Sequence, residues 1–81
     1  MTEEIFATVT DEGPMGAKLV VFVKPRGCPG LGGWKSGKDG TEWWTRVKGE
    51  DAARVLETAS IAPGNVVSIM LDGDKITDIS F

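Results

Sequence analysis

Short extended segments separated by turn signals restrict the fold of this 81-residue chain more than any other feature. Five ranges alternate apolar and polar residues or are rich in β-branched ones: 5–11, 17–24, 41–48, 65–71 and 75–81. Clusters of glycine and proline, or an Asp-Gly pair, lie between them. Residues 50–59 instead repeat apolar side chains at helical spacing, at Ala52, Val55, Leu56 and Ala59. The sequence therefore predicts one small, mostly β domain over residues 1–81, with a single helix after the third strand.

This order of three strands, one helix and two strands resembles that of the OB-fold over nearly the whole chain. The OB-fold is a five-stranded, partly open Greek-key barrel, and the resemblance implies that the helix plugs one end of such a barrel. A barrel also removes the exposed strand edges that make a small flat sheet prone to aggregate. A two-layer sandwich with the helix over one sheet stays open as an alternative. An SH3-like barrel would have a short 3₁₀ turn in place of the helix.

Two adjacent tryptophans, Trp43 and Trp44, must point to opposite faces of their predicted strand, because side chains alternate along a strand. The same alternation sorts the first three strands into two faces. We expect the inward positions to hold Ile5, Ala7, Val9, Leu19, Val21, Val23, Trp43, Thr45 and Val47. Each of the three strands then places one aromatic ring on its outward face: Phe6, Phe22 and Trp44. Large exposed apolar surfaces usually mark a binding site.

The charge of the chain is unevenly distributed. The formal net charge is −3, but residues 18–48 carry seven bases and two acids, a net charge of +5. The other residues carry two bases and ten acids, a net charge of −8. The basic part of the chain is also the aromatic part, and this combination is typical of proteins that bind single-stranded nucleic acid. Bases stack on the rings, and lysine and arginine contact the phosphates.

We therefore expect this chain to bind single-stranded DNA or RNA with little sequence preference. The OB-fold resemblance implies that the second and third strands form the platform, together with nearby loops. The predicted nucleic-acid-binding residues are Lys18, Phe22, Lys24, Arg26, Trp34, Lys35, Lys38, Trp44, Arg46 and Lys48. Two alternative roles of the outward rings stay open. They form an interface with a protein partner or in a homodimer, as in a small interaction module or inhibitor, or they are covered by the loop 26–40.

That loop holds six glycines in fifteen residues, so the sequence predicts a mobile basic segment able to close over a single strand. The alternative for Trp34, within the loop, is that it packs against the barrel wall. Residues 32–39, GGWKSGKD, match part of the nucleotide-binding phosphate loop. They place Asp39 where that motif has Ser or Thr, and they precede a predicted strand instead of a helix, so we exclude nucleotide hydrolysis.

The sequence offers little else for chemistry. It has no histidine and one cysteine, Cys28, which excludes the usual zinc sites and leaves no thiol–imidazole pair. We predict no catalytic residue, no cofactor and no metal site, and hence no enzyme. No apolar run is long enough to span a membrane, so we expect no membrane contact. A lone thiol is typical of a reducing compartment, which favours the cytoplasm.

Overall fold

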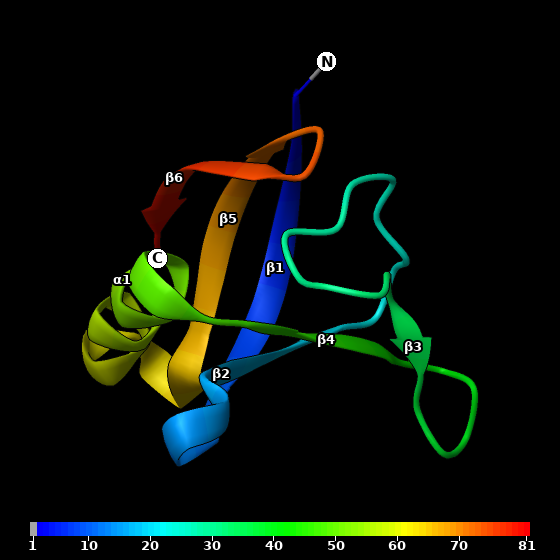
Figure 1. The fold of residues 1–81 in the computed structure, drawn as a ribbon, viewed down its shortest axis with the longest axis horizontal. Helices are drawn as coiled ribbons and strands as arrows, with labels where there is room; N and C mark the ends of the chain where they lie inside the picture. The colour runs from blue at the N-terminus through cyan, green and yellow to red at the C-terminus, as the bar shows by residue number, and fades with distance from the viewer. Residues whose placement is uncertain (1) are drawn as a thin grey trace.

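The computed structural model describes residues 2–81, which form an antiparallel sheet and one α-helix (Figure 1). The strands are β1 (Thr2–Asp11), β2 (Ala17–Val21), β3 (Lys35–Ser36), β4 (Trp43–Val47), β5 (Val66–Asp72) and β6 (Lys75–Ser80). Helix α1 (Gly49–Ile61) follows β4, and two 3₁₀ turns, η1 (Gly13–Met15) and η2 (Pro63–Asn65), precede β2 and β5. The strand order is β3-β4-β2-β1-β5-β6. The predicted mostly β fold with one helix is confirmed.

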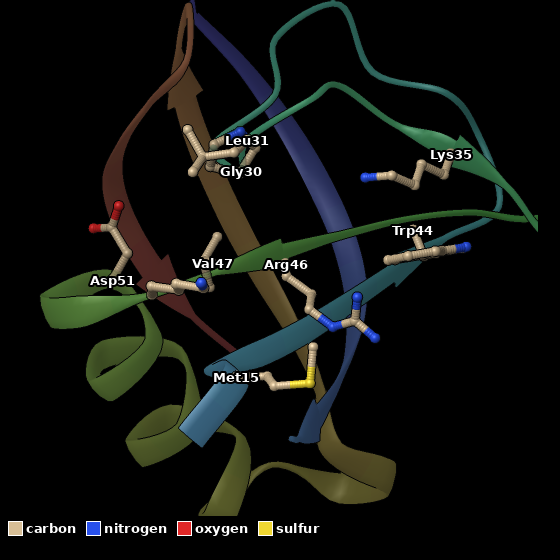
Figure 2. Close-up of a pocket in the computed structure, with 10 residues that line it drawn as sticks. Met15, Gly30, Leu31, Lys35, Trp44, Arg46, Val47 and Asp51 are labelled. Carbon is tan, nitrogen blue, oxygen red and sulfur yellow. The ribbon is translucent and has the colours of Figure 1, made fainter. Parts of the chain in front are cut away.

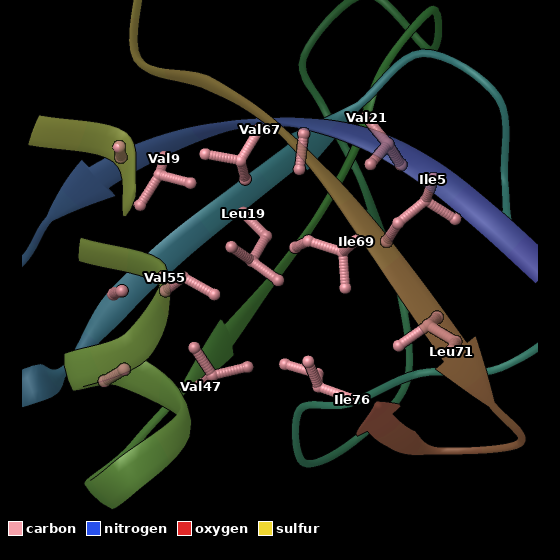
Figure 3. Close-up of a cluster of buried hydrophobic side chains, with 14 of the residues drawn as sticks. Ile5, Val9, Leu19, Val21, Val47, Val55, Val67, Ile69, Leu71 and Ile76 are labelled. Carbon is pink, nitrogen blue, oxygen red and sulfur yellow. The ribbon is translucent and has the colours of Figure 1, made fainter. Parts of the chain in front are cut away.

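One hydrophobic core lies between the curved sheet and α1 (Figure 3). Its largest members with almost no exposed surface are Leu19, Val21, Val55, Val67, Ile69 and Leu71. Ile5, Ala7 and Val9 of β1 are buried beside them, and so are Thr45 and Val47 of β4, so the predicted inward faces of these strands are confirmed. Trp43 packs against the margin of this core and is half-buried.

Helix α1 covers one end of the core with Ala52, Val55 and Ala59, three of the four residues whose spacing predicts the helix. Glu50 and Asp51 occupy its first turn, where negative charge interacts favourably with the helix dipole. Among residues 2–81, no helix has the length and apolar character needed to cross a membrane.

The second strand is shorter than predicted. Strand β2 ends at Val21, whereas the sequence predicts a strand over 17–24, and Val23 is 82% exposed instead of inward. Beyond Val21 the chain leaves the sheet, and backbone N–H groups farther along it bond to a side chain of β1. Those of Arg26 and Gly27 donate to the carboxylate of Glu3, at 3.2 and 2.7 Å. A Cβ at residue 27 would collide with the carbonyl oxygen of Gly73, so only glycine fits there.

Strand pairing does not close the sheet into a barrel within residues 2–81, since neither β3 nor β4 on one side is a hydrogen-bonded neighbour of the other edge strand, β6. The glycine-rich segment bridges part of the open side instead. The Cys28 N–H donates to Asp74 Oδ1 in the β5–β6 turn at 2.8 Å, and its Sγ lies 3.5 Å from Thr45 Oγ1 on β4. The segment thus links the two sides that strand pairing leaves apart. Its mobility remains a prediction.

Candidate nucleic-acid interface

The outward side of β2, β3 and β4 carries three of the seven cationic residues that the sequence predicts to bind nucleic acid. The strands pair Lys18 with Arg46 and Val20 with Trp44, and β3 places Lys35 opposite Trp44. Residues two apart on one strand share a face, so Arg46 is the neighbour of Trp44 along β4. Lys35 lies directly opposite Trp44 on β3, and Lys18 lies diagonally across from it on β2. We call Lys18, Lys35, Trp44 and Arg46 the Trp44 face.

The half-buried ring of Trp44 is surrounded by positive charge. The Nζ atoms of Lys18 and Lys35 lie 5.1 and 4.9 Å from the ring centroid, and the guanidinium carbon of Arg46 lies at 4.9 Å. Figure 2 shows the ring edge-on, with Lys35 on one side of its plane and Arg46 on the other. Each contact is a cation–π interaction, worth about 0.5–1 kcal/mol at an exposed site. In the free protein, therefore, cations occupy the positions where a base would stack.

The two cations seen beside the ring differ in how firmly they are held. Arg46 Nη2 lies 3.3 Å from Glu12 Oε1, and about a third of the Arg46 side chain is exposed. Its Nε atom is shielded from solvent and has no hydrogen-bond partner within residues 2–81. Lys35 is exposed, lies on the two-residue edge strand β3, and makes no ion pair with the described residues. Lys35 is consequently the easier of the two to displace.

Two grooves meet at Trp44. The first has a volume of about 370 Å³ and lies between the glycine-rich segment and the start of α1 (Figure 2). It is lined by Met15, Pro29, Gly30, Leu31, Lys35, Trp44, Arg46, Val47, Lys48 and Asp51. The second, on the β3 side, is lined by Lys18, Ser36, Gly37, Lys38, Glu42 and Trp44. Lys48 and Lys38 thus extend the positive charge of the Trp44 face away from the ring in two directions.

The turn that carries Lys38 is stabilised by hydrogen bonds to the carboxylate of Asp39, which belongs to the same turn. Asp39 Oδ1 accepts hydrogen bonds from the Thr41 hydroxyl, at 2.7 Å, and from the Thr41 N–H, at 3.1 Å. These bonds stabilise the carboxylate and lower the pKa of Asp39 below its usual value, the hydroxyl bond contributing most. Asp39 is therefore fully ionised at neutral pH, where it offsets part of the charge of Lys38.

The structure places the remaining predicted residues away from Trp44. Trp34 packs against the core and donates its Nε1–H to the Gly27 carbonyl at 2.7 Å, so it is not a free stacking ring. Phe22 and Lys24 line a different groove with β1, and the Lys24 Nζ lies 4.9 Å above Trp43. Arg26 lies beside Glu3 and the β5–β6 turn.

Sequence reasoning missed three residues of this site. Glu12 holds Arg46 from the turn that precedes β2, and Met15 and Leu31 supply apolar surface to the first groove. No local pattern marks Glu12, because its contact joins residues 34 positions apart. Met15 and Leu31 are exposed apolar residues within glycine-containing turns, and that exposure is detectable only in the folded chain.

Among residues 2–81, no cluster of three or more Asp, Glu, Cys or His side chains is arranged to hold a metal ion. Comparison of the chain with protein-family models, with curated proteins and with solved structures finds no match. Its function must therefore be inferred from the geometry and charge of the Trp44 face.

Proposed function

We propose that this protein binds single-stranded DNA or RNA, with little sequence preference, through the Trp44 face and the two grooves that meet there. The observation that carries the proposal is the arrangement of three cations about 5 Å from one tryptophan ring. Only an anionic ligand with flat apolar groups uses both the charge and the ring. A single strand supplies phosphates for the cations and unpaired bases for the ring.

A base gains access to the Trp44 ring by displacing one of the cations that cover it. A base approaches from the side of Lys35, whose ammonium leaves the ring and binds a phosphate of the same strand. Arg46 stays on the opposite side, where Glu12 holds it 3.3 Å away. Stacking contributes about 1–3 kcal/mol per base, more than the single cation–π contact that it replaces. The exchange is therefore favourable even before the phosphate contacts are counted.

The two grooves give the strand a path. From Trp44, one groove leads toward Lys48 and the other toward Lys38, and the charged groups along this path are basic except Asp51 and Glu42. Contacts of this kind recognise the backbone and read no base edges, which explains the proposed lack of sequence preference. The net charge of −8 on the rest of the chain repels phosphates and confines binding to this surface.

We further propose that the curved sheet is an OB-fold-like barrel that the glycine-rich segment completes. Its support is the element order, the helix after the third long strand, and the bridge from β4 through Cys28 to the β5–β6 turn. In OB-folds the second and third strands form the face that binds oligonucleotides. In this chain those strands are β2 and β4, which carry the Trp44 face.

Titration with fluorescently labelled oligo-dT and oligo-U at several salt concentrations tests the proposed function. With five cations in contact (Lys18, Lys35, Lys38, Arg46 and Lys48), log affinity falls against log salt with a slope of about −3.5, at about −0.7 per contact. The intrinsic tryptophan fluorescence should be quenched in parallel. If neither oligonucleotide binds at low salt, the proposal is wrong, and an acidic protein surface becomes the better partner for the same face.

A further inference from the structure

A third groove lies beside β1, outside the Trp44 face. It has a volume of about 390 Å³ and is lined by Glu3, Glu4, Ile5, Phe6, Val21, Phe22, Val23, Lys24 and Pro25. Three large apolar side chains at its rim are mostly in solvent: Phe6 is 63% exposed, Phe22 68% and Val23 82%. We call this the β1 groove. Isolated exposed apolar residues are common on proteins, but three that share one groove form a patch.

The β1 groove also contains unpaired backbone. Strand β1 pairs with β5 from Thr2 to Thr8, but its pairing with β2 begins only at Thr8. On the β2 side, none of the backbone hydrogen bonds found within residues 2–81 joins residues 2–7 to residues 22–25. Alternate residues of this part of β1 therefore direct an N–H and a C=O toward the groove. An open strand edge of this kind is a template for an added extended segment.

Both ends of the β1 groove are closed, which limits what it can hold. At one end the Thr8–Val20 pair joins β1 to β2. At the other, the Glu3 carboxylate accepts the N–H groups of Arg26 and Gly27. An extended segment contacts the groove along Glu4 to Ala7 only, and its two ends must leave toward solvent. The space suits a few residues of an exposed loop or an unstructured tail, not a long strand.

The charges at the rim favour a protein segment over nucleic acid. Glu3 and Glu4 are both acidic, and neither forms an ion pair with a residue that the structure describes. Within residues 2–81, the one side-chain hydrogen bond that Glu4 accepts comes from the Ser68 hydroxyl, at 2.7 Å. The single base of the rim, Lys24, lies over the Trp43 ring. Two carboxylates repel phosphates, whereas they attract a lysine or an arginine.

We infer that the β1 groove docks a short extended segment of a partner protein, with apolar side chains against Phe6, Phe22 and Val23. The segment forms main-chain hydrogen bonds with Glu4 to Ala7 and places a lysine or arginine beside Glu4. This inference is independent of nucleic-acid binding, because it uses none of the residues of the Trp44 face.

The test uses a displayed library of short random peptides, selected on the wild-type protein after depletion on the Phe22→Asp variant. We expect enriched peptides without proline, with alternating apolar side chains and one lysine or arginine. A synthetic copy should shift the amide NMR signals of residues 4–7 and 22–24 and leave those of residues 43–48 unchanged. Failure to enrich any peptide, or shifts confined to the Trp44 face, would overturn the inference.

Two variants and one modified peptide sharpen the result. Phe22→Ser should weaken binding of the synthetic peptide about tenfold or more, as expected for an aromatic at the centre of an interface. Ile61→Ser is the matched control, because Ile61 is also exposed, at 69%, but lies at the end of α1. This variant should bind the peptide with the affinity of the wild type. Two N-methylated peptides are compared, one modified at the odd-numbered residues and the other at the even-numbered residues. Only one of them should lose binding, since alternate N–H groups point to opposite edges of the peptide and only one edge faces β1. Equal binding of the two N-methylated peptides would exclude main-chain pairing.

The same variants identify other occupants. Concentration-dependent dimerisation of the wild type that Phe22→Ser abolishes would show that a second copy of the chain occupies the groove. Oligo-dT binding that Phe22→Ser weakens would show that nucleic acid does so. Either result would overturn the inference. Oligonucleotide binding that Phe22→Ser leaves unchanged supports two separate surfaces.

Discussion

The Trp44 face and the β1 groove both place aromatic rings at the protein surface, but their surroundings differ. Three cations surround the half-buried ring of Trp44, each about 5 Å from its centroid. Phe6 and Phe22 are more exposed, and they lie beside two carboxylates and an unpaired stretch of backbone. The neighbours of an aromatic ring, more than its exposure, therefore determine which class of ligand it fits.

The two regions also use one sheet in different ways. At Trp44 itself, β4 pairs with β2 on one side and with β3 on the other, so the ring and its cationic neighbours are what this part of the face offers to a ligand. At the β1 groove, β2 has ended and the backbone itself is available. The early end of β2 at Val21 is thus what distinguishes the two regions.

Among the three tryptophans, Trp43 should contribute most to stability, because its ring packs against the core from within a long strand and that of Trp44 does not. We expect the free energy of unfolding to fall by about 3 kcal/mol for Trp43→Ala. Trp44→Ala, its matched control on the opposite face, should lower it by less, about 1.5 kcal/mol, the sum of three exposed cation–π contacts at about 0.5 kcal/mol each. Urea unfolding followed by circular dichroism measures both. A larger loss for Trp44→Ala would mean that its ring is structural and that the Trp44 face is not a binding surface.

Trp34→Ala should come second in its effect on stability. Its ring packs against the core and its Nε1–H bonds Gly27, so its removal should lower the free energy of unfolding by about 2 kcal/mol. Oligonucleotide affinity should be unchanged under conditions where the variant is folded. Leu31→Ala is the control within the same loop, since Leu31 is 85% exposed, and its effect on stability should stay below about 0.5 kcal/mol. Loss of affinity without loss of stability in Trp34→Ala would instead make Trp34 a ligand contact.

The contrast between Trp43 and Trp44 could be predicted from the sequence, and the position of Trp34 could not. Alternation along a strand is local, so the aliphatic residues of 17–21 suffice to orient both tryptophans of the neighbouring strand. The element order and the helix follow from equally local patterns. The position of Trp34 depends on the route of the glycine-rich segment. That route is set by contacts between residues 24 and 46 positions apart, Glu3 with Gly27 and Cys28 with Asp74.

The division of the predicted basic and aromatic set has the same cause. Composition alone groups ten residues, but the chain leaves the sheet after Val21, which separates Phe22 from Trp44, and the Glu3 carboxylate then holds it at Arg26 and Gly27. The distribution of charge along the chain shows that seven cations lie within residues 18–48. It gives no information on which cations share a surface, because that depends on the register between β2, β3 and β4.

Trp44→Ala should weaken oligonucleotide binding by about 1–3 kcal/mol, the contribution of one stacked base. The salt dependence should stay nearly unchanged, because stacking releases no counterions. Phe22→Ala is the matched control from the β1 groove, and we expect it to leave oligonucleotide affinity unaltered. Anisotropy titrations of labelled oligo-dT over a range of salt concentrations provide both quantities. If Phe22→Ala costs as much as Trp44→Ala, the two regions form one continuous nucleic-acid surface and the distinction between them fails.

The smallest effect should come from Lys35→Ala, compared with Lys48→Ala. Both remove one phosphate contact, so each should lower the magnitude of the salt slope by about 0.7. Lys35 also covers the Trp44 ring, at 4.9 Å from its centroid, whereas Lys48 only lines the first groove. A base must displace the Lys35 ammonium, at a cost of about 0.5–1 kcal/mol that Lys35→Ala removes.

Lys35→Ala should therefore bind more tightly than Lys48→Ala by that amount at every salt concentration. As salt rises, its affinity should reach that of the wild type at a lower salt concentration than the affinity of Lys48→Ala does. The titrations used for Trp44→Ala measure this difference, with Lys75→Ala as a control because β6 lies outside the Trp44 face. Identical lines for Lys35→Ala and Lys48→Ala would show that the base does not enter on the side of Lys35. In that case Lys18 or Arg46 is the cation displaced. If it is Arg46, Glu12→Gln, which frees Arg46 from its 3.3 Å ion pair, should raise the affinity for oligo-dT.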